Sequence, residues 1–412
     1  MKENNLSASF ALLRSRRFGT FWFASLLSNI GTWVQQVAQP WLLLSLNASS
    51  FLIGLDSFAL GAPGWLLTLV GGMLADRSDR RRVITQFQSI QMLCPVLLVI
   101  LLLFGGVRPW MVILLSLVVG ITDALSMPSF QSIVPSIVAR NQIPAGLALN
   151  STQFNLSRIM GPAIAGVLLV GIGAAGCFAV SALSYIPFIV VALWILPRQP
   201  RKSRLGRGDR RKMWTDSKKI FRTPFLQGAF MTVFLSSLLC AQLLTFSPIL
   251  VKNAFHGDAS HFSIAVTAFG IGGLIGAVAL LFVDADGGRR RLCASFAGIY
   301  GIILILAALS PWFWGLVALL TLAGMSMGIS NISANTLLQA NIPARLRGQT
   351  VSLYMLAMRG GLSIGSLLTG ISASWLGVSW ALLLNGVLAV LLQSLVGYRW
   401  MRASAPTLGS PE

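Results

Sequence analysis

Long apolar runs constrain this chain more than any other feature, because each is about as long as a helix that crosses a lipid bilayer. Such a helix needs about 20 mostly apolar residues. The 412 residues are 55% hydrophobic and only 10% charged, whereas a soluble domain carries roughly 25% charged residues. Backbone in lipid must satisfy its own hydrogen bonds, and runs of this length do so as helices. The sequence therefore predicts an all-α polytopic membrane protein.

Twelve of these runs are expected to form transmembrane helices. They lie near residues 18–46, 51–75, 83–105, 109–133, 146–170, 174–196, 225–251, 261–283, 292–309, 312–338, 349–373 and 378–400. A polar, basic stretch follows the sixth run. We therefore expect an N-terminal six-helix bundle at 1–196, a cytoplasmic basic linker at 197–224 and a C-terminal six-helix bundle at 225–412.

The basic residues are sorted to one side of these spans. The net charge is +20, from 31 Lys and Arg against 11 Asp and Glu. If the N-terminus is cytoplasmic, 27 basic residues fall in cytoplasmic segments and only Arg108 and Lys252 fall in the opposite loops. The positive-inside rule then predicts that both termini are cytoplasmic and that the basic segments contact anionic lipids. Because the charge does not cluster on a soluble domain, nucleic acid is not an expected partner.

The two halves of the chain are related in sequence. IPAGLALNSTQFNLSR (143–158) and IPARLRGQTVSLYMLAMR (342–359) share an opening IPA and reach an arginine at a similar depth. FLIGLDSFALGAPG (51–64) is similar to HFSIAVTAFGIGG (261–273), and each continues into an Arg-rich loop that contains Asp. Both copies begin on the same side of the membrane. The pattern indicates two parallel six-helix repeats.

GGMLADRSDRRR (71–82), between the second and third spans, resembles the cytoplasmic loop signature of the major facilitator superfamily, G-x-x-x-D-R/K-x-G-R-R/K. The matching residues are Gly72, Asp76, Arg77, Arg80 and Arg81, while Asp79 replaces the second glycine. The resemblance implies a major facilitator fold with a gate at this loop, in which the Asp accepts charge-assisted hydrogen bonds. The alternative is an ordinary basic loop.

RIMGPAIAG (158–166), in the fifth span, resembles the G-P-x-x-G-G signature of the antiporter branch. Gly161, Pro162 and Gly166 match, and Ala165 replaces the first of the paired glycines. Small residues four apart allow close helix packing, and proline bends a helix. The resemblance favours export over import, and the alternative is a packing kink without a bearing on direction.

Four charged residues lie inside predicted spans, namely Asp56, Asp123, Arg158 and Arg359. Each costs roughly 2.5–3.5 kcal/mol to insert, so each is expected to face a partner or a polar cavity. Similar depths predict an Asp123–Arg158 pair, and the alternative is two independent groups. Asp123 and Asp56 are the intramembrane acids, which makes them, with Arg158, the candidates for proton coupling.

Arg359 is the repeat partner of Arg158, but the tenth span holds no acid at its level. We interpret it as a site for an anionic substrate; the alternative is a structural clamp on helix-end carbonyls. Polar side chains on other spans could line the same cavity, or join helices instead. The predicted substrate-binding set is Asn29, Gln36, Arg359, Gln242, Asn331, Asn335 and Tyr354.

No enzyme signature accompanies these features. There is no P-loop GxxxxGK[ST] and no HExxH motif in the sequence. The cysteines have no metal-like spacing and fit small buried apolar residues. The sequence therefore predicts a chain that is not an enzyme and uses no cofactor and no metal.

The segment at 336–370, together with the two motifs, is similar to the branch of the superfamily that contains the bacterial enterobactin exporter. This resemblance implies proton-coupled export of a hydrophilic, acidic metabolite such as a siderophore. The implied mechanism is rocker-switch alternating access by a monomer in the bacterial inner membrane. The alternatives are a multidrug or lysophospholipid transporter, an uptake symporter, and a membrane receptor that does not transport.

Overall fold

The computed structural model describes residues 11–131, 133–139, 142–195, 223–282, 288–342 and 346–403. All regular secondary structure in these residues is helical, and none of them lies in a strand. The predicted all-α architecture is therefore confirmed. The linker predicted at 197–224 lies almost entirely outside the described residues.

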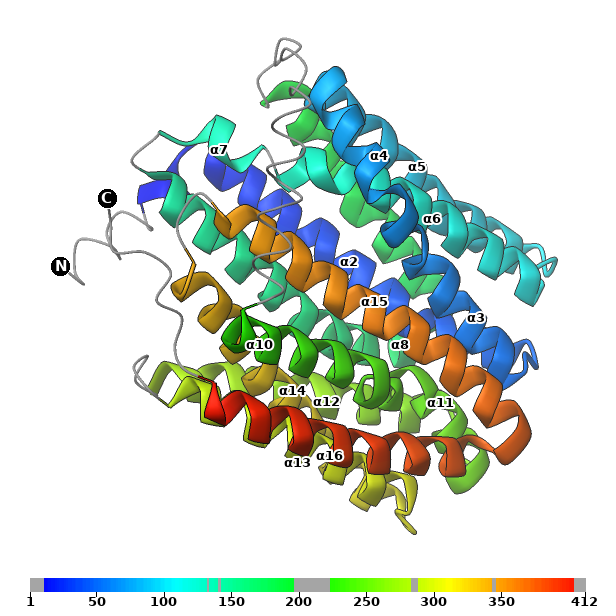
Figure 1. Cartoon of the computed structure of the whole chain (residues 1–412). Helices are drawn as coiled ribbons and strands as arrows, with labels where there is room; N and C mark the ends of the chain where they lie inside the picture. The colour runs from blue at the N-terminus through cyan, green and yellow to red at the C-terminus, as the bar shows by residue number, and fades with distance from the viewer. Residues whose placement is uncertain are drawn as a thin grey trace. The chain divides into compact units, whose positions relative to one another are not determined.

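The chain forms two compact units. The first contains Met1–Leu46 and Pro63–Arg204, and the second contains Asn47–Ala62 and Leu205–Glu412. Figure 1 shows α13 (Arg289–Ala308) and α16 (Val378–Arg402), both in the second unit, running side by side. The predicted bundle boundaries stay a prediction.

The first unit is built around the pairing of its first helix with its longest one. Its helices are α2 (Phe18–Ser45), α4 (Pro63–Arg77), α5 (Arg80–Leu103), α6 (Pro109–Gln131), α7 (Val134–Ile137) and α8 (Ile143–Trp194). α2 packs against α8, α4 packs against α6, and α5 packs against both α6 and α8. Within α8, Gly173 has φ 67°, a left-handed conformation that glycine adopts without a steric penalty. This bend divides the 52 residues of α8 into two successive helices.

An aromatic core holds the first unit together where α2 begins. The rings of Phe21, Phe130 and Phe188 lie 5.5–6.0 Å apart, from α2, α6 and α8. The buried residues Phe18 and Ile84 belong to the same cluster. These contacts fix the start of α2 against the end of α8.

The second unit contains one helix from the N-terminal half of the sequence. Its elements are α3 (Ser50–Gly61), α10 (Pro224–Leu235), the π-helix η2 (Ser236–Cys240), α11 (Gln242–Phe255), α12 (Ala259–Ala279), the 3₁₀ turn η3 (Leu280–Phe282), α13 (Arg289–Ala308), α14 (Phe313–Ala340), α15 (Arg347–Leu376) and α16 (Val378–Arg402). α3 packs along α15, while α13 packs against α14 and α16. α12 and α14 touch through glycines, because a Cβ at Gly272 or Gly324 would overlap a backbone carbonyl of the other helix.

The structure changes two details of the predicted spans. The span expected at 51–75 is two helices, because α3 ends at Gly61 and α4 begins at Pro63, which has no N–H to continue the helix. Ten stretches of described residues are long and apolar enough to cross a membrane, and one of them, Ala145–Trp194, contains the bend in α8. The 28-residue α2 is not among the ten. The predicted count of twelve is therefore not confirmed.

Candidate functional site

Gln35 and Gln39, which are not among the predicted site residues, connect α2 to α8 and α6 of the first unit through hydrogen bonds. The Oγ of Ser181 on α8 donates to Oε1 of Gln35 at 3.0 Å. The Nε2 of Gln39 donates to the Oγ of Ser116 on α6. Both glutamines are buried. Their polar groups are used for packing between helices, which is the usual role of amides inside membrane spans.

Asn29 and Gln36 lie on a different face of α2. They are seven residues apart, which is close to two helical turns, so their side chains project in the same direction. Both are half-buried, and no hydrogen bond joins either side chain to another described residue. Of the polar residues on α2, these two have amide groups available for a ligand.

The motif in the first half of α8 works as a contact surface for α2. A Cβ at Gly161 would overlap the Cβ of Trp33, so only glycine permits this approach. The ring of Trp33 also packs against that of Phe154, with centroids 6.4 Å apart. Pro162 lies inside the helix and Gly166 is buried. The motif therefore has a direct packing role, whatever its bearing on the direction of transport.

The predicted gate lies at the junction of α4 and α5. The surroundings of Gly72 and the side chains of Asp76 and Arg77 lie outside the described part of the structure. Arg80 and Arg81 are half-buried in the first turn of α5. Asp79, which departs from the family signature, is the N-cap of α5, and its Oδ1 accepts from the backbone N–H of Arg81 at 3.2 Å. An Asp just before a helix is a recognised start signal, so the sequence could have shown this cap.

The intramembrane charges lie on four different helices. Asp56 on α3 and Arg158 on α8 are buried, with 4% and 8% of their surfaces exposed. Asp123 on α6 and Arg359 on α15 are half-buried. The pairing of Asp123 with Arg158 stays a prediction.

Asp123 has an uncharged counterpart in the C-terminal repeat. Gly-Ile-Thr-Asp at 120–123 aligns with Gly-Ile-Ser-Asn at 328–331, so Asn331 occupies the equivalent position. Asn331 is buried, and its backbone oxygen accepts from the hydroxyl of Tyr354 at 3.3 Å. The alignment is visible in the sequence and extends the expectation that the tenth span carries no acid at this level. At this position the N-terminal repeat carries a titratable carboxyl group and the C-terminal repeat carries an amide.

The predicted substrate-binding residues of the second unit, Arg359 excepted, are buried among its helices. They are Gln242, Asn331, Asn335 and Tyr354. The Oδ1 of Asn335 accepts from Nε2 of Gln339, one turn later in α14, at 2.9 Å. Burial and internal hydrogen bonds favour packing roles for Gln242, Asn335 and Tyr354. The side-chain Oδ1 of Asn331 is buried and accepts no hydrogen bond from a described residue.

Gln242 supports the π-helix at Ser236–Cys240. Its Nε2 donates to the carbonyl of Ser237 at 3.0 Å and to the carbonyl of Leu362 on α15 at 3.3 Å. Its Oε1 accepts from the Oγ of Ser366 on α15 at 2.8 Å. A π-helix widens the backbone spiral and often marks a functional position. Here the side chain of Gln242 links this irregular backbone to α15.

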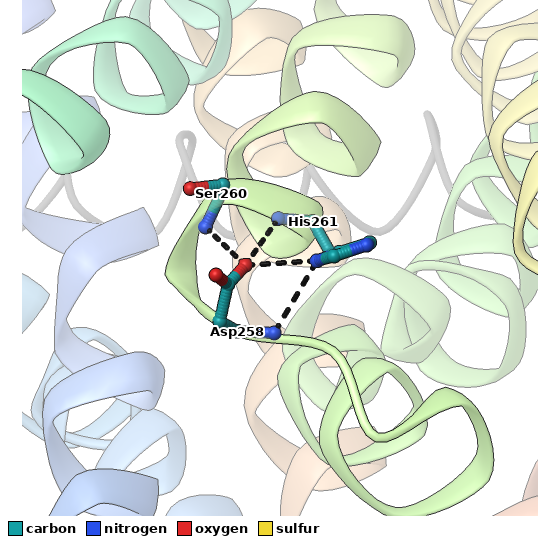
Figure 2. Close-up of polar contacts among 3 residues, drawn as sticks. All are labelled: Asp258, Ser260 and His261. Atoms are coloured by element: carbon teal, nitrogen blue, oxygen red, sulfur yellow. Dashed lines mark hydrogen bonds and ion pairs between the residues drawn. The ribbon is translucent and has the colours of Figure 1, made fainter.

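The turn between α11 and α12 is closed by a capping box (Figure 2). Asp258 is the N-cap of α12, and its Oδ1 accepts from the backbone N–H groups of Ser260 and His261 at 3.0 and 3.1 Å. The Nδ1 of His261 lies 2.8 Å from the same carboxylate. The same Nδ1 lies 3.4 Å from the backbone N–H of Asp258, so its tautomer decides whether it donates to the carboxylate or accepts from this N–H. The His261 contacts hold the pKa of Asp258 below its usual value.

The side chains that commonly bind metals are scattered over the described residues. They contain no group of three or more His, Cys, Asp or Glu side chains that could hold a metal ion. Cys94, Cys177, Cys240 and Cys293 are buried and not joined in disulfides.

Comparison with known sequences defines the family. Residues 7–406 match the family described as "Transmembrane secretion effector". The chain is 27% identical over 366 residues to the "Staphyloferrin A transporter" of Staphylococcus aureus, covering 87% of this chain and 90% of that protein. It is 24% identical over 424 residues to the "Enterobactin exporter EntS" of Shigella boydii, covering 98% of each. It is also 24% identical to the "Macrolide efflux protein A" of Streptococcus pyogenes, covering 91% of this chain and 93% of that protein.

Solved structures agree on the fold. The nucleoside transporter NupG (D323A mutant) superposes with a TM-score of 0.69 at 14% identity, covering 94% of this chain and 99% of that one. A bacterial homolog of the human lysosomal transporter Spinster superposes with a TM-score of 0.65 at 16% identity, covering 96% and 99%.

The fold and these matches define a multi-pass membrane transporter of small molecules. The chain belongs to the transmembrane secretion effector family of the major facilitator superfamily, in the branch that includes siderophore exporters.

Proposed function

We propose that this chain exports a small anionic metabolite, such as a siderophore, across the bacterial inner membrane in exchange for protons. The observation that carries the proposal is similarity over nearly the whole chain to a staphyloferrin A transporter and an enterobactin exporter. The charge asymmetry of the loops supports cytoplasmic termini. In this proposal a monomer works by alternating access, and its gate is the α4–α5 junction.

Arg359 is the proposed anchor for the anionic substrate. It lies about 18 Å along the 30-residue α15, near the middle of the helix. A guanidinium group presents a planar set of donors that suits carboxylates and other oxyanions. Asn29 and Gln36 are the proposed neutral contacts, because their amides are half-buried and not engaged with described residues. The amide of Gln242 is engaged in helix packing, so a direct role in binding is less favoured for it.

Asp123 is the proposed proton carrier, with Asp56 as the other candidate and Arg158 as the cation that tunes it. A coupling group must change its protonation during the cycle, and the repeat counterpart Asn331 cannot titrate. The test is transport in inside-out vesicles under an imposed pH gradient. Asp123→Asn should uncouple transport from the gradient, and Asp258→Asn, at a loop acid, serves as the matched control. Gradient-driven transport that persists in an Asp56→Asn, Asp123→Asn double variant would exclude this assignment.

Efflux of amphipathic drugs is the second candidate function. It is favoured by similarity to "Multidrug efflux pump Tap" of Mycolicibacterium fortuitum, 25% identical over 396 residues, and to the macrolide efflux protein. The two functions differ in their dependence on Arg359. A cationic or neutral drug should not require this guanidinium, whereas an anionic metabolite should. Competition between a siderophore and a macrolide for transport would show whether one site serves both.

A further inference from the structure

The start of α13 and the end of α16 are joined by one arginine side chain. Nη1 of Arg290 donates to the carbonyls of Ala403 and Trp400 at 2.8 and 3.3 Å, and Nη2 donates to that of Met401 at 3.3 Å. The last carbonyls of a helix have no donor within the helix. Arg290 therefore caps α16 from the first turn of α13.

The same end of α16 is fixed against α10. Trp400 is buried, and its ring lies 6.3 Å from that of Phe225. A Cβ at Gly228 would overlap the indole of Trp400. The guanidinium of Arg290 lies over the Phe225 ring at 5.6 Å. These contacts make a rigid platform from the ends of α10, α13 and α16.

Three further arginines at this platform are exposed, namely Arg291, Arg399 and Arg402. The first turn of α13 contains no acidic residue, and its N-cap is Gly288, which has no side chain to cap the helix. Arg291 directly follows Arg290 at the start of α13. Arg402 lies between Met401 and Ala403, whose carbonyls accept from Arg290. Arg291 and Arg402 therefore lie at the two helix ends that Arg290 joins. Arg399 and Arg402 are three residues apart on α16, and Arg402 stacks on the exposed ring of Tyr398 at 4.2 Å. We call these three arginines and Tyr398 the basic platform.

Apolar surface continues from the basic platform along both helices. The exposed apolar residues are Ile299, Ile302 and Leu306 on α13 and Leu388, Leu391 and Leu395 on α16. In a membrane protein such a surface faces acyl chains, and a tyrosine at its edge suits the headgroup region. Arginines at this edge present charge-assisted donors to a phosphate group.

We propose that the basic platform binds the headgroup of an anionic phospholipid whose acyl chains lie along α13 and α16. The positive charge of the three arginines complements the negative charge of the phosphate group. Arg290 holds the start of α13 against the end of α16, where these arginines lie. This site lies within the second unit and does not depend on which cargo is transported.

The test is lipid binding by the purified full-length protein, measured by native mass spectrometry and by quenching with labelled lipid in mixed micelles. The probes are phosphatidylglycerol and phosphatidylcholine. The variant Arg291→Gln, Arg399→Gln, Arg402→Gln leaves Arg290 in place. Its matched control, Arg14→Gln, Arg16→Gln, Arg17→Gln, removes three exposed arginines from the first unit. Thermal unfolding in detergent checks that both variants fold.

Phosphatidylglycerol should bind the platform variant at least about tenfold more weakly than the wild type, since each basic residue near an anionic headgroup contributes to binding. The control variant should lose binding by a clearly smaller factor, because its arginines contribute only the general attraction that every basic segment exerts on an anionic surface. Equal loss in both variants, unchanged binding in the platform variant, equal binding of phosphatidylcholine by the wild type, or displacement by an equal concentration of inorganic phosphate would each overturn the proposal.

Discussion

Replacing Gln242 with leucine measures how much one buried side-chain amide contributes to the free energy of unfolding of the C-terminal helices. Gln242 has no exposed surface and makes two hydrogen bonds to α15, one to the carbonyl of Leu362 and one from Ser366. Interhelical bonds in membrane proteins contribute about 0.6 kcal/mol each on average, which gives about 1.2 kcal/mol for the pair. The Ser237 carbonyl also loses a donor, at a cost of about 1 kcal/mol. Gln242→Leu should therefore lower the free energy of unfolding by about 2 kcal/mol.

The assay is reversible unfolding in mixed micelles with increasing SDS. The matched control is Gln36→Leu, the same chemical change at a half-buried glutamine with no bond to described residues. That variant should unfold like the wild type but transport the substrate less well. If Gln242→Leu is as stable as the wild type while Gln36→Leu is destabilised, the assignment of packing and binding roles is wrong.

Three further substitutions test the roles of Arg359, Gly161 and Asp258. Arg359→Met should fold normally and transport anionic substrates at least about tenfold more slowly, which corresponds to one lost charge-assisted contact. Arg359→Lys should restore part of the rate. Initial rates of transport in vesicles measure both effects. Gly161→Leu should lower the thermal unfolding temperature, because the added side chain overlaps Trp33; Gly171→Leu, where no atom lies within 4 Å of the added Cβ, is the control. Asp258 has a lowered pKa in the folded protein, so its stabilising effect is present above the ordinary Asp pKa of about 4 and is lost as the pH falls through the lowered value. The difference in unfolding temperature between the wild type and Asp258→Asn should therefore shrink below about pH 4, and a difference that grows there would contradict the role of the carboxylate.

Much of the fold could be predicted from the sequence because lipid permits few alternatives. Run length and the absence of charge indicated helices, and most of the predicted spans lie on observed helices. The break before Pro63 and the bend at Gly173 depend on local backbone geometry, which hydropathy does not report. The π-helix at Ser236–Cys240 has no sequence signal of its own and depends on partners such as Gln242.

The site was harder to predict, because a polar side chain in an apolar span can either bond to a neighbouring helix or face a ligand. Gln36 and Gln35 are neighbours in sequence, yet one is half-buried without a bond to described residues and the other accepts from Ser181. Only the direction in which each side chain projects separates these uses. Asp79 could have been recognised as a helix cap, and Asn331 as the counterpart of Asp123, from the sequence alone.

Uptake of labelled siderophore into inside-out proteoliposomes, with and without an imposed pH gradient, shows whether this chain is a proton-coupled exporter of anionic metabolites. The wild type should accumulate an anionic siderophore with carboxylate or acidic phenolic groups only when the gradient is present, and Arg359→Met should not accumulate it. Accumulation of a cationic drug with no transport of any such siderophore would exclude this function.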